Sequence, residues 1–197
     1  MDKFTARRNE LAEAALKTLA ERGYAQTGLR DIAQNSEFSH GVLHYYFADK
    51  TDLITHCVRE YKAVCVTRYD EVVETATTAA ELATGFLDKL AETLTDEAPM
   101  HRLWYDLRNQ SMFEPAFRAD VTEIDLSLER MIWRIVTRYA ELSGLSPQVG
   151  SPTMYAIFDG LFQQALLRHI GGAPDALDEL QVRVRALLPG LVAGPTR

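Results

Sequence analysis

The segment from Thr27 to Lys50 constrains the fold of this chain most, because it predicts two short helices joined by a tight turn. It reads TGLRDIAQNSEFSHGVLHYYFADK. Threonine and serine, both common N-cap residues, mark the starts of predicted helices over Leu29–Asn35 and Ser39–Phe47. The turn Ser36–Phe38 separates them, and two helices at this spacing are typical of a helix-turn-helix.

The second of these helices carries side chains that an ordinary core does not require. Leu43 and Phe47 share one face, which we expect to pack on Ile32 and on the preceding helix. Imidazole and phenol groups bond phosphates or base edges, glycine allows close approach, and a valine methyl contacts thymine methyl groups. Lys50 is placed to meet a phosphate. The alternative is that the outward positions are the solvated face of a helical hairpin; they are His40, Gly41, Val42, His44 and Tyr46.

Helical spacing of apolar residues continues through the rest of the chain, and Gly and Pro fall between the periodic segments. We therefore expect an all-α fold with about nine helices. Residues 1–50 are the expected helix-turn-helix domain, and residues 51–197 the ligand-binding and dimerisation domain. The expected helices span residues 4–21, 29–35, 39–47, 49–76, 78–94, 99–112, 114–142, 152–170 and 175–191.

The charge of the chain is divided unevenly. Residues 1–50 contain seven Lys or Arg and seven Asp or Glu, so the remaining residues account for the whole net charge of −7. A neutral N-terminal segment on an acidic chain is compatible with DNA binding, because the attraction of phosphates is screened within about 10 Å at physiological salt.

Composition and cysteine usage favour a cytoplasmic protein without a membrane partner. The sequence has no run of about 18 apolar residues, and its first residues, MDKFTARRNE, lack the apolar region of a secretory signal. Cys57 and Cys65 lie on one expected helix, roughly 12 Å apart along its axis, which is too far for a disulfide. We expect buried reduced thiols, with a redox sensor as the alternative.

Neither an enzyme nor a metal or other cofactor is expected. The sequence lacks the motifs of serine hydrolases, P-loop proteins and dinucleotide-binding enzymes. His40 and His44 are four positions apart, but the glutamate of the HExxH zinc pattern is missing between them.

Two stretches, ERGYAQTGLRDIA and SHGVLHYYFADKTDL, resemble the signature of the tetracycline repressor family of bacterial transcriptional regulators. The resemblance covers about the first 55 residues and is specific in order and spacing, and the remainder agrees with the family in helical layout. It implies a homodimer bound to double-stranded operator DNA, with His40 and Gly41 directed toward bases. The residues with an implied DNA contact are Thr27, Arg30, Ser39, His40, Gly41, Val42, His44, Tyr45, Tyr46 and Lys50.

The chain departs from this family pattern at two positions. His44 replaces the usual tyrosine, which shortens its reach and places an imidazole, the side chain used in many pH-sensitive switches, at that position. Glu37 stands where the turn often has glycine. If that position requires a positive φ, a residue other than glycine costs roughly 1–2 kcal/mol there. These departures affect the expected operator sequence more than the expectation of DNA binding.

The last two expected helices are the candidates for dimerisation. The helix over residues 152–170 is apolar over too wide a surface for a single core-facing stripe, and residues 175–191 repeat leucine and valine at alternating spacings of three and four. The resemblance implies a four-helix interface here, and the alternative is burial inside one subunit. The candidate interface residues are Tyr155, Phe158, Phe162, Leu166, Leu177, Leu180, Val184 and Leu187.

A small-molecule effector is the second expected partner of the helical body. Pockets between helices are mostly apolar with a few polar groups, and an inward-facing Arg108 would favour an anionic or strongly polar ligand. The alternative is that these side chains form plain core. The candidate pocket residues are Tyr61, Cys65, Tyr69, Trp104, Arg108, Phe113, Phe117, Met131 and Ile135.

The sequence thus predicts a dimeric repressor that binds a palindromic operator and is released by a ligand. A helical small-molecule sensor or carrier without DNA binding is the alternative. A salt-sensitive gel shift on upstream DNA separates the two.

Overall fold

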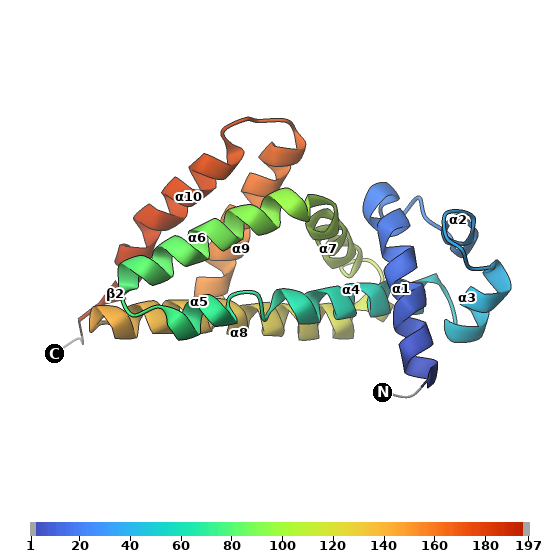
Figure 1. The fold of residues 1–197 in the computed structure, drawn as a ribbon, viewed down its shortest axis with the longest axis horizontal. Coiled ribbons are helices and arrows are strands. Elements are labelled where there is room, and N and C mark those ends of the chain that lie inside the picture. The colour runs from blue at the N-terminus through green and yellow to red at the C-terminus, as the bar shows by residue number, and fades with distance from the viewer. Residues whose placement is uncertain (1–2, 195–197) are drawn as a thin grey trace. The chain divides into compact units, whose positions relative to one another are not determined.

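A computed structural model describes residues 3–194 of the protein, and nearly all of its regular structure is helical (Figure 1). This confirms the all-α prediction. A single antiparallel pair of two-residue strands, β1 (Ser146–Pro147) and β2 (Val192–Ala193), is the exception within the described residues. The helices are α1 (Lys3–Arg22), α2 (Leu29–Gln34), α3 (His40–Tyr46), α4 (Lys50–Cys65), α5 (Asp70–Thr75), α6 (Ala79–Asp96), α7 (Ala98–Gln110), η1 (Pro115–Phe117), α8 (Arg118–Ser143), α9 (Ser151–Ile170), α10 (Ala176–Leu187) and η2 (Leu188–Leu191).

The described chain forms two compact units, each built from two segments. The first unit comprises residues 3–65 and 99–124, and the second comprises residues 66–98 and 125–194. The first unit therefore adds α4, most of α7 and the start of α8 to the segment over which the helix-turn-helix domain was expected.

The core of the first unit forms where α1 packs on α4 and α2, and α2 packs on α3. Apolar residues at helical spacing on α1, such as Leu11, Ala15 and Leu19, are fully buried, as are Leu53 of α4 and Ile32 of α2, the helices on which α1 packs. Each buried leucine or isoleucine side chain contributes roughly 1.5–3 kcal/mol relative to exposure. Burial of one stripe of α1 thus fixes the helices on either side of the turn.

The long helix expected over residues 49–76 is interrupted, and that prediction is wrong. Helix α4 ends at Cys65, a turn follows, and α5 begins at Asp70. The Val66 carbonyl, which would accept a bond within a continuous helix, accepts a hydrogen bond from Arg134 Nη2 at 2.7 Å instead. The Asp70 amide donates to the Thr67 carbonyl at 3.1 Å, which closes the turn. Competing side-chain and turn hydrogen bonds end the helix.

The second unit is organised around α10, which packs on both α9 and α6 (Figure 1). Phe86 of α6 is buried between two aromatic neighbours, with ring centroids 5.3 Å from Tyr69 and 5.8 Å from Phe158. The expected capping box at the start of α6 is confirmed, because Thr78 Oγ1 accepts from the Glu81 amide and Glu81 accepts from the Thr78 amide. Local caps and buried aromatic contacts together define this unit.

None of the helices in residues 3–194 combines the length and the apolar character that crossing a bilayer requires.

Both cysteines are buried free thiols. Cys57 Sγ donates a hydrogen bond to the Ala12 carbonyl at 3.2 Å, and burial raises the pKa of the Cys57 thiol well above its usual range. A thiol that stays protonated at neutral pH is a poor nucleophile, so Cys57 is unsuited to redox sensing.

Cys57 should therefore resist thiol reagents in the folded protein. In a Cys65→Ala variant, where Cys57 is the only cysteine, we expect labelling by a disulfide reagent near pH ~8 to be at least about tenfold slower than in concentrated guanidinium chloride. Rapid stoichiometric labelling of the folded variant, with native circular dichroism, would contradict this assignment.

Candidate DNA-binding surface

Helix α3 is short, and its position depends on two buried anchors. Leu43 is 0% exposed and Phe47, at the C-cap, is 1% exposed. The Arg8 guanidinium of α1 lies over the Phe47 ring, 4.8 Å from the ring centroid, and the His56 ring of α4 lies 5.8 Å from the Phe47 ring, centroid to centroid. Phe47 thus joins α3 to both α1 and α4. A seven-residue helix is not stable alone in water, because its own hydrogen bonds stabilise it too little. The contacts of Leu43 and Phe47 provide the remaining stabilisation.

The start of α3 is capped as expected. Ser39 is the N-cap residue, and its Oγ accepts a hydrogen bond from the Val42 amide at 3.3 Å. In the turn before it, Phe38 is buried, and the Arg7 guanidinium lies 4.7 Å from its ring centroid. The turn thus has its own anchor in the core.

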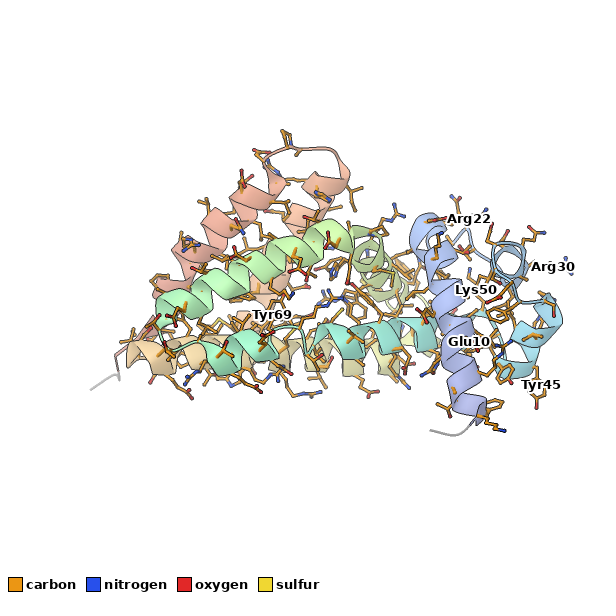
Figure 2. The ribbon with its side chains drawn as sticks, viewed as in Figure 1. Glu10, Arg22, Arg30, Tyr45, Lys50 and Tyr69 are labelled. Carbon is orange, nitrogen blue, oxygen red and sulfur yellow. The ribbon has the colours of Figure 1, made fainter. Side chains whose placement is uncertain are left out.

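Most of the predicted DNA contacts lie on the outer side of α2 and α3. Arg30 and Tyr45 point away from the core of the unit (Figure 2). An open groove of about 330 Å³ runs between the two helices, lined by Arg30, Ala33, Gln34, Phe38, Ser39 and His40. Arg30, Ser39, Gly41, His44 and Tyr45 are exposed, and His40, Val42 and Tyr46 are half-buried.

Gly41 has open space around it. A Cβ built on Gly41 would meet only Ser39 Oγ, at 4.0 Å, and the backbone of Gly41 is ordinary helix. The fold itself therefore does not require glycine here. Glycine permits close approach of an external molecule to the backbone, which is compatible with the predicted DNA contact at Gly41.

Rings cover both ends of the exposed face. The imidazoles of His40 and His44 meet edge to face, with centroids 4.4 Å apart. At the other end, Phe4 of α1 packs on Tyr46, with centroids 4.8 Å apart, and the Tyr45 ring lies 5.0 Å from that of Tyr46. These contacts restrict the side chains that project from α3.

Glu37 is exposed and carries no backbone strain. Within residues 3–194, only glycines adopt a positive φ. Glu37 therefore does not carry the backbone strain energy that a positive φ would cost a residue other than glycine.

Thr27 departs from its predicted role. Its side chain is 1% exposed, and its hydroxyl donates to the Gly23 carbonyl at 2.8 Å. The N-cap of α2 is Gly28, whose amide donates to Asp31 Oδ2 at 2.8 Å. The prediction of Thr27 as a DNA contact is corrected, because a buried hydroxyl that is already bonded holds the loop before α2 and does not face a phosphate.

Lys50 is also held within the unit. Its ammonium donates to the Tyr24 carbonyl and lies 4.0 Å from the centroid of the Tyr24 ring. Burial lowers the pKa of Lys50, and the nearby carboxylates of Asp106 and Asp31 oppose this lowering. Lys50 thus joins the start of α4 to the loop after α1, and a phosphate would have to share its ammonium with Tyr24.

Helix α7 holds the same loop from its other side. Asp106 Oδ2 accepts from the Tyr24 amide at 2.7 Å, and Arg102 Nη2 donates to the Ala20 carbonyl and, at 2.9 Å, to the Glu21 carbonyl. Phe117 of η1 packs edge to face on the Tyr24 ring, with centroids 5.1 Å apart. We call Tyr24 and these bonded neighbours the Tyr24 corner. Sequence analysis missed it, because its partners lie far apart along the chain, 82 positions for Tyr24 and Asp106 and more for Tyr24 and Phe117, and no local pattern relates them.

Comparisons with known proteins agree with this geometry. The family model described as "Bacterial regulatory proteins, tetR family" matches residues 11–57, which include α2 and α3. The HTH-type transcriptional repressor KstR2 of Mycolicibacterium smegmatis is 25% identical over 195 residues, covering 83% of this chain and 95% of the relative. The chain carries the DNA-binding domain of the TetR family.

Solved structures show the same fold over nearly the whole chain. A transcriptional regulator of Saccharomonospora viridis in complex with choline has a TM-score of 0.77 at 17% identity, covering 95% of this chain and 98% of that one. FadR of Bacillus subtilis in complex with stearoyl-CoA has a TM-score of 0.71 at 20% identity, covering 90% and 95%. Together with the tetR family match and the similarity to KstR2, this makes the protein a DNA-binding transcriptional regulator.

The predicted effector residues of this TetR-family regulator are divided between its two units. Tyr69, Met131 and Ile135, all buried, belong to the second unit, and the other six belong to the first. Phe113 is 82% exposed and lines no interior, so its assignment is corrected. Phe117 is fully buried against Tyr24 and is core of the Tyr24 corner. Of the rest, Cys65 and Trp104 are buried, and Tyr61 and Arg108 are half-buried.

Five of the eight predicted dimer residues are core of the single subunit, as the alternative interpretation held. Their neighbours in the same chain already cover them, so they offer little surface to a partner. Tyr155, for example, donates its hydroxyl to Asp125 Oδ1 at 2.7 Å. Phe162, Leu177 and Leu187 are half-buried and stay candidates. The five buried residues are Tyr155, Phe158, Leu166, Leu180 and Val184.

No group of three or more potential metal ligands occurs within residues 3–194, so the His40–His44 pair has no third ligand there.

Gly41→Ala should separate the fold from DNA binding. The added methyl meets no close neighbour, so we expect the free energy of unfolding to stay the same or to rise by up to about 1 kcal/mol. Operator affinity should fall about tenfold, the order of one lost base contact, because the methyl prevents close approach. Fluorescence anisotropy with labelled operator and urea unfolding measure the two quantities.

Gly190→Ala is the matched control, because a Cβ at Gly190 also meets nothing within 4 Å and lies on η2. It should leave operator affinity unchanged. Unchanged affinity in Gly41→Ala as well would remove Gly41 from the DNA interface.

Proposed function

We propose that this TetR-family regulator is a homodimeric cytoplasmic repressor that binds a palindromic operator and is released by a small-molecule effector. The observation that carries the proposal is the outer face of α3, where open space at Gly41 lies beside exposed polar and aromatic groups over a buried anchor. A helix presented in this way fits the major groove of B-DNA.

Contacts to DNA divide by chemistry. Ser39, His40, Gly41, Val42 and His44, at the start and middle of α3, are proposed to contact base edges. Hydrogen-bonding and methyl groups are the groups that distinguish base pairs. Arg30, Tyr45 and Tyr46 flank them and are proposed to contact phosphates, which fixes the orientation of the helix on the duplex.

A second copy of the chain is the proposed occupant of an open groove on α9 and α10. The groove has a volume of about 600 Å³ and lies in the second unit. A Cβ at Gly160 would meet nothing within 4 Å, so the α9 backbone is accessible to a partner helix. Leu187, which is half-buried and is one of the interface residues predicted from the sequence, lies in this groove. The residues that line the groove are Ile157, Gly160, Leu161, Gln164, Arg183, Ala186 and Leu187.

Two recognition helices are needed because a palindromic operator presents two half-sites about one DNA turn apart. An effector lowers operator affinity only if it binds preferentially to a state whose recognition helices do not match that spacing. Couplings of this kind are typically about 1–3 kcal/mol. Repression as the direction of control follows the description of KstR2 as a repressor.

The identity of the effector does not follow from the fold. Two regulators with this fold were crystallised with ligands as different as stearoyl-CoA and choline. The side chains of this chain therefore have to indicate the chemistry of its own effector.

DNA binding is tested with the DNA upstream of the gene itself, in gel shifts across a series of salt concentrations. His40→Ala should lower the preference for operator over scrambled DNA by about 1–3 kcal/mol. Arg30→Ala should weaken binding to both DNAs alike and reduce the salt slope by about one. If His40→Ala keeps the full preference, His40 does not contact bases; if no fragment shifts at any salt, the repressor proposal fails.

Dimerisation through the groove is tested with Leu161→Arg, which places a charge on a face that a partner would bury. In sedimentation velocity we expect the dimer to be replaced by a 22.2 kDa monomer with native helix content. Leu126→Arg, at an exposed leucine on α8, is the control and should remain dimeric. A dimeric Leu161→Arg would place the interface elsewhere.

A further inference from the structure

Four polar or aromatic side chains gather inside the first unit, where α4 and α7 meet. Tyr61 and Lys62 come from α4, and His101 and Trp104 come from α7. Lys62 is 3% exposed, His101 is 6% exposed and Trp104 is 1% exposed. We call these four residues the α4–α7 cluster.

Trp104 is the unexplained member of the α4–α7 cluster. Its indole Nε1–H is buried and has no hydrogen-bond partner within residues 3–194. Buried donors in folded proteins nearly always have an acceptor. An indole nitrogen can only donate, so what is missing beside Trp104 is an acceptor atom.

The neighbours of Trp104 indicate the charge of that acceptor. Lys62 Nζ lies 5.3 Å from the centroid of the Trp104 ring. The same Nζ lies 3.5 Å from His101 Nδ1, and His101 Nε2 lies 3.4 Å from the Tyr61 hydroxyl. Because an ammonium only donates, Nδ1 is the accepting nitrogen of His101, and Nε2–H donates to Tyr61. An acceptor for the indole would therefore sit beside a cation, where an anionic oxygen is stabilised most.

We propose that the α4–α7 cluster binds the carboxylate of a small-molecule effector, with one oxygen on Trp104 Nε1–H and the other on the Lys62 ammonium. A carboxylate offers two oxygens and accepts hydrogen bonds of about 2.9 Å on each, so one group can join both donors. The four residues come from the first unit alone.

The position of the α4–α7 cluster indicates how effector binding there would change DNA binding. This extension rests on the proposed function. His101 and Trp104 lie on one face of α7, and Arg102 and Asp106 lie on another, roughly 150° away at 100° per residue. The second face is the one that bonds Ala20, Glu21 and Tyr24 in the Tyr24 corner. An anion that moves or turns α7 therefore acts directly on the loop between α1 and α2.

Binding is tested on the full chain by the indole ¹⁵N–¹H signal of Trp104, assigned by its loss in Trp104→Phe. The probes are hexanoate and 1-hexanol, which share an alkyl chain and differ in the carboxylate. We expect hexanoate to move the Trp104 signal downfield and to bind about tenfold more tightly than hexanol, as a charge-assisted hydrogen bond predicts. The Trp133 signal should not move.

Lys62 is tested by a pair of substitutions. Lys62→Met should reduce the preference for hexanoate over hexanol to about one, and Lys62→Arg, which keeps the charge, should retain most of it. Lys89→Met, at a lysine on α6, is the control and should behave as the wild type. Equal binding of the two probes to the wild type, or binding of neither, would overturn the proposal. A Trp104 signal that does not respond, as expected if a bound water satisfies the indole, would also overturn it.

The extension to DNA is measured separately, as operator affinity with and without hexanoate. We expect hexanoate to weaken operator binding about tenfold in the wild type and not in Lys62→Met. If hexanoate moves the Trp104 signal but leaves operator affinity unchanged, the carboxylate site stands and its coupling to DNA fails. If no operator is bound at all, the proposed function fails while the site is still judged by the Trp104 signal.

Discussion

Burial of Leu43 and Phe47 is the interaction on which the rest of the first unit depends. Helix α3 has seven residues, too few to persist in water, so these two side chains determine whether it forms and which face it turns outward. Because Phe47 packs between Arg8 of α1 and His56 of α4, a shift of either helix changes the packing that holds α3. Because Leu43 and Phe47 bury the inner face of α3, its other face points outward, where DNA is proposed to bind.

The Tyr24 corner is the second constraint. The Tyr24 amide donates a hydrogen bond to Asp106, and the Tyr24 carbonyl accepts one from Lys50. The Tyr24 ring contacts the Phe117 ring and the Lys50 ammonium. Four contacts on one residue hold the loop between α1 and α2 against both α4 and α7. A regulator needs such a connection, since an effector changes DNA binding only through contacts that differ between two states.

Local patterns predicted the helix-turn-helix well, and longer-range assignments less well. The caps at Ser39 and Thr78 were correct because a cap depends on residues three positions away. The continuous helix to residue 76 was wrong because Arg134, far along the chain, bonds the Val66 carbonyl. An apolar stripe looks the same whether its own subunit or a partner covers it, so the sequence did not show that Leu180 and Val184 are covered by their own subunit.

By itself, the sequence determined an all-helical regulator with a recognition helix from His40 to Tyr46, because spacing, caps and the TetR-family signature are all properties of neighbouring residues. Only the tertiary structure showed that Thr27 is buried, that Lys50 is shared with Tyr24, and that Lys62 meets Trp104. The physical reason is the same in each case. Burial and charge pairing depend on which distant segments pack together, and helical periodicity does not encode that choice.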